Sequence, residues 1–158
     1  MNPWTSNEWE KYLPQNRRRG LRFRFESDID PEVKRACMSF AKWLRSNFIF
    51  PLRVPVYMKA ARRVRTRDKD NVCGVFFEPF DYKNEPYIRV SCGDYCELEK
   101  TRGKDNALAA ILFTIAHELT HYFQWINKVK VTEKGSERQA TNYARYIVNK
   151  YASTRDHP

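Results

Sequence analysis

The sequence predicts a single α+β domain, and three observations support that fold class. Three stretches carry apolar residues at the three- and four-residue spacing of amphipathic helices. Several short segments alternate apolar and polar side chains as strands do, and turn residues separate them. A chain of 158 residues with 42% hydrophobic residues is long enough to bury one core. We expect an N-terminal arm over 1–29, the domain over 30–152 and a tail over 153–158.

The first 59 residues predict a strand, a helix and a second strand. Residues 21–25 alternate like a short strand. A helix is expected over 31–48, because Asp30 can cap it, Pro31 suits its first turn and apolar side chains recur on one face. Residues 50–59 also alternate, but they contain two prolines, which cannot donate to a ladder. This segment is therefore predicted to be an edge strand or an irregular one.

Two further strands and two further helices complete the predicted domain. They are expected in chain order at 72–78 (strand), 87–92 (strand), 106–127 (helix) and 136–152 (helix). Gly74 in the third strand indicates a bulge or a close approach of the backbone to another element. Residues 93–106 are expected to be a polar connection.

The helix predicted over 106–127 carries two histidines at the spacing of metal ligands. His117, Glu118 and His121 form the pattern H-E-x-x-H. Positions i and i+4 share one helical face, so both imidazoles can bind one metal ion, which is the zinc arrangement. Glu118 projects beside that face and can act as general base on a zinc-activated water. The chain has only three histidines, and the third, His157, lies in the tail, which favours a zinc site over two structural histidines.

A catalytic zinc site needs a third protein ligand, and Glu137 is the best candidate. It lies sixteen residues after His121, near the start of the last predicted helix. Ala140 and Ala144 share its stripe, and small residues there allow two helices to approach closely. Glu133 is the alternative ligand, but it is expected in the preceding loop. A further reading of Glu137 is an ordinary acid in the first turn of a helix.

These residues carry a family resemblance. His117-Glu118-Leu119-Thr120-His121, followed by Glu137-x-x-Ala140-x-x-Tyr143-Ala144, resembles the zincin metallopeptidases whose third ligand is a glutamate on the following helix. In its compactness the chain is similar to ImmA/IrrE-type and related small bacterial or phage minimal zincins. The resemblance implies a small, twisted, mostly antiparallel sheet of three to four strands. That sheet would pack against an N-terminal helix, the H-E-x-x-H helix and a C-terminal ligand helix.

The resemblance also implies an activity and a substrate position. It implies a zinc metallopeptidase that hydrolyses a peptide bond in a protein or peptide substrate. In minimal zincins the substrate lies extended along an edge strand above the active helix, which implies residues 86–92 here. The residues of that candidate substrate strand are Tyr87, Ile88, Arg89 and Val90.

Three more side chains are candidates for supporting roles. Tyr143 is a candidate for stabilising the transition state, although packing between the last two helices is the simpler reading of this tyrosine. Thr120 and Gln124 are candidates for hydrogen bonds that hold the metal ligands in place.

The charge balance allows a second kind of function. Lys and Arg exceed Asp and Glu by 29 − 19, a net charge of +10, which favours polyanionic partners. The clustered basic residues are Arg17, Arg18, Arg19, Arg62, Arg63, Arg65 and Arg67. They indicate a nucleic acid or acidic partner, and hence a nucleic-acid-associated regulator on the same scaffold, although a solvated face is the simpler reading. A third alternative is a protein in which zinc only joins two helices; the intact Glu118 argues against it.

Composition also bears on location. No apolar run reaches the length of a membrane span, and the N terminus has no signal pattern. Four cysteines in a chain of this length do not make a disulfide framework. Cys92 and Cys96 have a spacing that some zinc sites use, but unpaired thiols are the simpler reading. We therefore expect a cytoplasmic protein without membrane contact.

Overall fold

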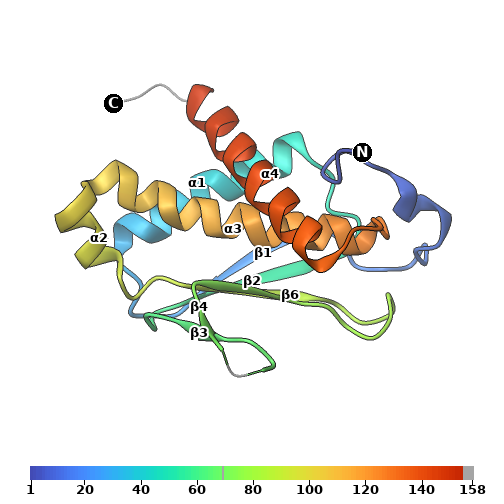
Figure 1. Ribbon diagram of the computed structural model, residues 1–158, viewed down its shortest axis with the longest axis horizontal. Helices are drawn as coiled ribbons and strands as arrows, with labels where there is room; N and C mark the ends of the chain where they lie inside the picture. Colours follow the sequence, from blue (N-terminus) through green and yellow to red (C-terminus); the bar gives the residue numbers. More distant parts are fainter. Residues whose placement is uncertain (69, 155–158) are drawn as a thin grey trace.

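The computed structural model describes residues 1–68 and 70–154, in which α-helices lie on one face of a four-stranded sheet (Figure 1). The α+β class that the sequence predicts is confirmed. In chain order the elements are a 3-10 helix at Glu8–Lys11, β1 (Leu21–Phe25), α1 (Pro31–Asn47), β2 (Val54–Lys59), β3 (Val64–Arg65), β4 (Asn71–Val72), β5 (Gly74–Phe77), β6 (Tyr87–Ser91), α2 (Tyr95–Arg102), α3 (Lys104–Ile126) and α4 (Glu133–Ser153).

The main sheet is mixed, with strand order β1-β2-β6-β5. β1 and β2 pair in parallel, as do β2 and β6, whereas β6 and β5 pair antiparallel. The mostly antiparallel sheet implied by the resemblance is therefore wrong. The physical reason lies in the connection between β1 and β2. It contains helix α1, and a crossover helix of this kind returns the chain in the same direction.

Strand β2 lies inside the sheet, so the prediction of an edge or irregular strand is also wrong. Val54 N donates to Gly20 O on the β1 side, and Lys59 O accepts from Cys92 N on the β6 side. Because successive residues face opposite neighbours, the nitrogen of Pro55 is directed toward β6. Pro55 precedes the first β2–β6 pair, Val56↔Ile88. Its missing N–H thus falls at the end of the ladder and costs no bond within it.

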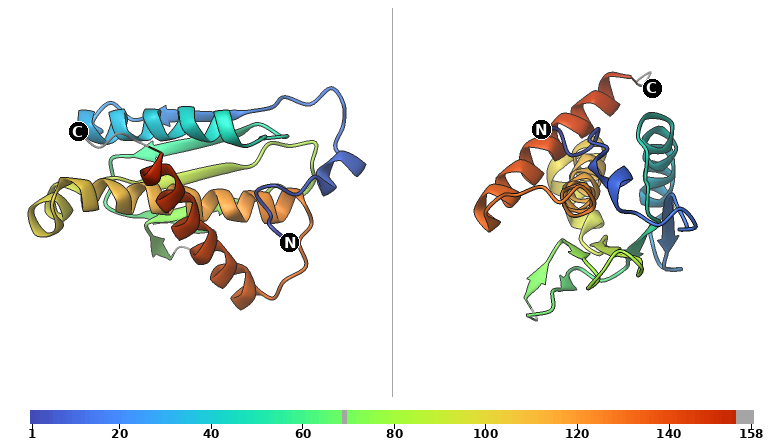
Figure 2. Two further views of the ribbon diagram at one scale, coloured as in Figure 1. Left: turned by 90° about the horizontal axis from the view of Figure 1, so that it is seen from above. Right: turned by 90° about the vertical axis from the view of Figure 1, so that its right-hand side faces the viewer.

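The core forms between the sheet and two helices. Leu21 of β1, Val56 of β2 and Ile88 of β6 are fully buried beneath α1 and α3. Figure 2 shows α1 and α3 side by side above the sheet, with α4 crossing α3 as an outer layer. Helix α1 begins as expected, because the Asp30 side chain accepts a hydrogen bond from Glu32 N at 2.8 Å.

The position of β6 corrects another expectation. Residues 86–92 were assigned to an edge strand, but β6 pairs with β2 on one side and with β5 on the other. The two edge strands of the sheet are β1 and β5, and β5 is the one that packs against α3. Because both sides of the β6 main chain are paired with neighbouring strands, a substrate strand cannot pair with β6.

Two segments between strands and helices also differ from expectation. The polar connection over 93–106 contains helix α2, which buries only Tyr95 and so has almost no apolar stripe for a sequence to reveal. Helix α4 begins at Glu133, because the Thr132 side chain accepts from Gly135 N at 3.0 Å and caps it there. Glu133 therefore lies in the first turn of α4 instead of a loop.

Residues 1–29 are integrated into the body and do not form a peripheral arm. They supply β1 to the sheet, and Trp4 is 3% exposed. The indole Nε1 of Trp4 donates to Thr120 Oγ1 at 2.9 Å, and its ring packs on Phe48 and Phe123. The predicted boundary at residue 29 thus cuts through the core. Of the predicted tail, residues 155–158, with His157, lie outside the described residues.

Two expectations drawn from composition can be compared with the described chain. All four cysteines are free thiols, as expected; Cys37 and Cys92 are buried, and Cys73 and Cys96 are exposed. Among the described helices, none combines the length and hydropathy that crossing a bilayer requires.

Replacing Trp4 tests whether the N-terminal segment is part of the core. Trp4→Ala is expected to lower the free energy of unfolding by about 3–5 kcal/mol, because a buried aromatic side chain is lost. Urea unfolding followed by circular dichroism measures the change. Ile49→Ala, at a position that is 69% exposed, is the control and should change stability by at most about 0.5 kcal/mol. A Trp4→Ala protein as stable as this control would restore the reading of a peripheral arm.

Candidate metal centre

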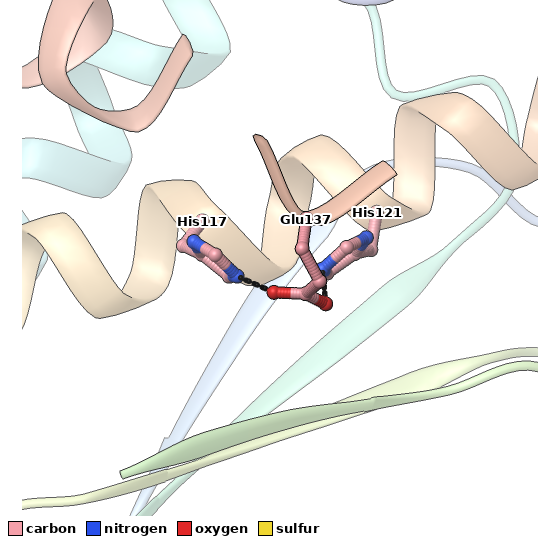
Figure 3. Close-up of side chains that lie close together, drawn as sticks. All are labelled: His117, His121 and Glu137. Carbon is pink, nitrogen blue, oxygen red and sulfur yellow. Dashed lines mark hydrogen bonds and ion pairs between the residues drawn. The ribbon is translucent and has the colours of Figure 1, made fainter. Parts of the chain in front are cut away.

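Three donor groups from α3 and α4 converge at one point (Figure 3). The His117 Nε2 atom lies 3.1 Å from Glu137 Oε2, and the His121 Nε2 atom lies 2.9 Å from Glu137 Oε1. The histidines share one face of α3, as their spacing predicts, and Glu137 reaches them from α4. The structure thus brings together the three residues that the sequence singles out as ligands.

This donor set could hold a metal ion, and its chemistry suits zinc. The candidate ligand atoms all lie within 4.8 Å of one another. Zinc holds such atoms at about 2.0–2.2 Å in a tetrahedron, which places them about 3.3 Å apart. Two imidazoles and one carboxylate are a common ligand set of catalytic zinc sites, in which water takes the fourth position.

The hydrogen bonds of His121 show that its Nε2 atom, which faces the Glu137 carboxylate, carries a lone pair and no proton. Gln124 Nε2 donates to Ser136 O and to Gln139 Oε1, which fixes the orientation of the amide. Gln124 Oε1 therefore accepts from His121 Nδ1–H at 2.8 Å, and also from Ser136 Oγ at 2.7 Å. The lone pair of Nε2 then points at a carboxylate oxygen, an arrangement that a shared cation stabilises. Gln124 thus makes a hydrogen bond to one of the candidate ligands.

The crossing of α3 and α4 brings Glu137 into range. Ala140 and Ala144 are fully buried where α4 packs on α3, so the two backbones approach closely, as the sequence predicts. Glu137 lies one turn before Ala140 on the same side of α4. Glu133, the alternative ligand, lines the nearby cleft but does not belong to the converging group.

Thr120, the other candidate for a supporting hydrogen bond, faces a different part of the protein. Its hydroxyl donates to Ala116 O at 2.8 Å and accepts from the Trp4 indole. It therefore joins the N-terminal segment to α3 and makes no hydrogen bond to the metal ligands.

Glu118 is buried beside the donor group, with 6% of the residue exposed. Burial raises its pKa to about 8, with a smaller contribution from the negative charge of Glu137. Burial also lowers the pKa of His117, followed by the neighbouring His121, which favours the neutral imidazole that a metal ion requires.

Strand β5 approaches Glu118 at a glycine. A Cβ atom on Gly74 would lie 2.5 Å from Thr114 Cγ2 and 3.1 Å from Glu118 Cγ. A residue with a side chain would push the strand away from α3, so only glycine allows this spacing. The close backbone approach that Gly74 predicts is confirmed.

A cleft of about 1260 Å³ opens over the donor group. Its walls are β5, α3, and the segment 128–137 that leads into α4. His117, Glu118 and His121 line it together with Glu137. An extended chain that enters this cleft would meet the metal ligands and the free edge of β5 at the same time.

Other candidate residues lie away from this cleft. Tyr143 is not among its lining residues and packs against the core, with its ring 6.5 Å from that of Tyr146. Ile88 and Val90 are buried in the core, and Tyr87 and Arg89 lie on the opposite face of the sheet by strand alternation. The sequence did not predict that residues of β5 line the cleft. Nothing in the local sequence distinguishes an edge strand from an interior one.

Comparison with models of protein families, with curated proteins and with solved structures finds no match for this chain. Only the donor geometry and the cleft therefore bear on function.

Zinc binding tests the third ligand. The purified chain is expected to bind about one zinc ion, and Glu137→Ala is expected to weaken binding by more than about tenfold, because a charged ligand is lost. Competition with a chromophoric chelator measures both quantities. Glu133→Ala removes the same charge one turn earlier and is the matched control, expected to bind like wild type. Loss of binding in Glu133→Ala but not in Glu137→Ala would reverse the assignment.

The burial of Glu118 predicts a pH dependence for the metal-free protein. Its pKa is raised in the folded state, so between pH 4.5 and about 8 the folded chain keeps a proton that the unfolded chain releases. Stability should therefore fall as pH rises through this range, by at most about 1.4 kcal/mol per pH unit. Chemical unfolding in the presence of a chelator measures it, and Glu118→Gln should remove this part of the slope. Identical slopes for the two proteins would contradict the prediction.

Proposed function

We propose that this protein is a zinc-dependent peptidase that hydrolyses a peptide bond in a protein or peptide substrate. The observation that carries the proposal is the convergence of His117, His121 and Glu137 beside buried Glu118, in a cleft walled by a free strand edge. Each part supplies a distinct requirement of peptide hydrolysis, namely metal ligands, a proton carrier and a surface for an extended chain.

The metal ligands and Glu118 have separate tasks. His117, His121 and Glu137 would hold the zinc ion, which supplies Lewis acidity that polarises a carbonyl group and lowers the pKa of water. Glu118 accepts the proton of the attacking water and later donates it to the leaving amine. Its burial favours the protonated form that donates, and a nearby cation favours the carboxylate that accepts. The same group can therefore serve both half-steps near neutral pH.

Strand β5 is the part of the sheet that can hold a substrate by strand addition. Cys73 O accepts from Ser91 N, so Cys73 faces β6. The next outward-facing residues are Gly74 and Phe76, because alternate residues of a strand direct their N–H and C=O groups to opposite sides. A substrate strand paired there would lie over α3 next to Glu118. In this proposal the role first assigned to residues 87–90 passes to β5.

The burial of Glu118 also favours a catalytic over a purely structural zinc. Burying the carboxyl group of Glu118, with 6% of the residue exposed, lowers the stability of the fold, and a catalytic role would account for that cost. Structural zinc sites are closed by four protein ligands, whereas the converging group among the described residues has three. The open position is what a hydrolytic site needs.

Glu118→Gln tests the proposed chemistry separately from metal binding. The variant is expected to bind zinc like wild type, and to cleave a peptide library at least about a hundredfold more slowly, because the amide cannot carry the proton. Mass spectrometry identifies the cleaved peptides, and the chelator assay confirms the zinc. Glu133→Gln, in the same cleft, is the control and should keep wild-type activity. Cleavage of the same peptides at an unchanged rate by zinc-loaded Glu118→Gln would rule out this mechanism.

A further inference from the structure

The face of the sheet turned away from the helices carries an ordered set of aromatic and basic side chains. Helices α1, α3 and α4 lie on one side of the sheet, and the β3–β4 hairpin is the only described element below it (Figure 1). We call the surface that the helices leave uncovered the open face; the β3–β4 hairpin contacts β5 and β6, and its Arg67 lies 6.0 Å from the centroid of the Phe77 ring. Its side chains come from all four strands and include Arg22, Arg24, Pro55, Tyr57, Lys59, Val75, Phe77, Tyr87, Arg89 and Ser91.

The register aligns these side chains in rows across the strands. Arg24 pairs with Tyr57, Tyr57 with Arg89, and Arg89 with Val75, so one row crosses the whole sheet. Strands about 4.8 Å apart make this row about 14 Å long. In the neighbouring row Phe77 pairs with Tyr87. Directly paired residues project on the same side, so both rows face outward together.

The aromatic rings of the open face form a connected cluster. Phe77 and Tyr87 are stacked with centroids 4.6 Å apart, and Tyr57 meets Tyr87 edge-on at 6.1 Å. The Arg89 guanidinium lies 5.4 Å from the centroids of both Phe77 and Tyr87. Tyr57 is 37% exposed, and Phe77, Tyr87 and Arg89 are half-buried. A flat, π-rich ligand therefore finds exposed ring surface beside a cation.

Lys59 of this face pairs with Glu26 at 3.7 Å, but three arginines of the open face are not neutralised. Among the described residues, Arg22, Arg24 and Arg89 form no ion pair with a carboxylate. Several arginines that stood out in the sequence behave differently. Arg62 pairs with Glu97 at 2.6 Å and Arg63 with Asp94 at 3.0 Å. Within the described part of the chain, cations without an ion pair therefore lie on the sheet next to the aromatic rings, and Arg19, Arg65 and Arg67 elsewhere form no ion pair either.

We propose that the open face binds single-stranded nucleic acid. The exposed Tyr57 ring and the half-buried Phe77 and Tyr87 rings beside it can stack on unpaired bases, and the arginines can contact the phosphates between them. A duplex hides its base faces and would use only the arginines, and an anionic membrane would likewise leave the stacked rings without a partner. The net charge of +10 attracts a polyanion to the molecule as a whole. The combination of rings and cations in one row favours the single strand.

This binding surface is independent of the proposed hydrolysis. The open face and the donor group lie on opposite sides of the sheet, and no residue of the donor group belongs to the open face. Phe77 and Val75 of β5 border both the open face and the cleft. A protein held on the same nucleic acid strand would thereby be close to the cleft. Removing zinc should leave nucleic acid binding unchanged, so failure of one proposal does not decide the other.

Fluorescence anisotropy with labelled oligothymidine and oligouridine of about 12 nucleotides tests the proposal. Wild type is expected to bind both at about 50 mM salt, with affinity falling steeply as salt rises. Tyr57→Ala should weaken binding about tenfold, and Tyr57→Phe, which keeps the ring, should bind like wild type. Arg24→Gln with Arg89→Gln should weaken binding at least tenfold and reduce the salt slope by about 1.4, since two phosphate contacts are lost.

Controls separate this surface from general attraction to polyanions. Arg62→Gln with Arg63→Gln removes the same charge at ion-paired positions and should change binding less than threefold. Far-UV circular dichroism checks that each variant folds. If a variant does not fold, the double variant Arg22→Gln with Arg24→Gln replaces it, because both arginines are exposed on β1. The proposal fails if wild type does not bind, if both charge pairs weaken binding equally, or if Tyr57→Ala has no effect. Tighter binding to a duplex or to phosphatidylserine vesicles would also overturn it.

Discussion

The crossing of α4 over α3 is the contact on which the candidate site depends. His117 and His121 are placed by helix geometry alone, but a third ligand has to come from a distant part of the chain. Fully buried Ala140 and Ala144 let the two helices approach until the carboxylate of Glu137 lies about 3 Å from both imidazoles. Gln124 joins the same two helices and orients His121. Because packed helices carry all three candidate ligands, their placement does not depend on a loop.

The sheet has two faces with different chemistry. On the helix side, Gly74 lets β5 lie against Glu118, so a free strand edge borders the donor group. On the other side, the same strand contributes Val75 and Phe77 to a surface of rings and arginines. Strand alternation makes this possible, because neighbouring residues of β5 point in opposite directions. A short edge strand can thus serve both the cleft and the open face.

The sequence predicted what depends on local spacing. Helices α1, α3 and α4 follow from apolar periodicity, and α1 also from its Asp30 cap, whereas Glu137 follows from the need for a ligand on the helix after His121. The sheet was predicted less well, because strand order is decided by contacts far apart in the chain, such as Val56↔Ile88. Tyr95–Arg102 has no apolar stripe to mark it as a helix. The close approach at Gly74 was foreseen as one of two readings, but its partner Glu118 was not.

The central claim is that two imidazoles and one carboxylate bind a single zinc ion. X-ray absorption at the zinc edge of the zinc-loaded protein measures the ligand set directly. The account predicts a first shell of nitrogen and oxygen atoms at about 2.0–2.2 Å with the scattering pattern of two imidazole rings. It also predicts that one of these rings is lost in His121→Ala. A sulfur shell at about 2.3 Å, which would place the metal on cysteines, or a wild-type spectrum without imidazole rings, would contradict the account.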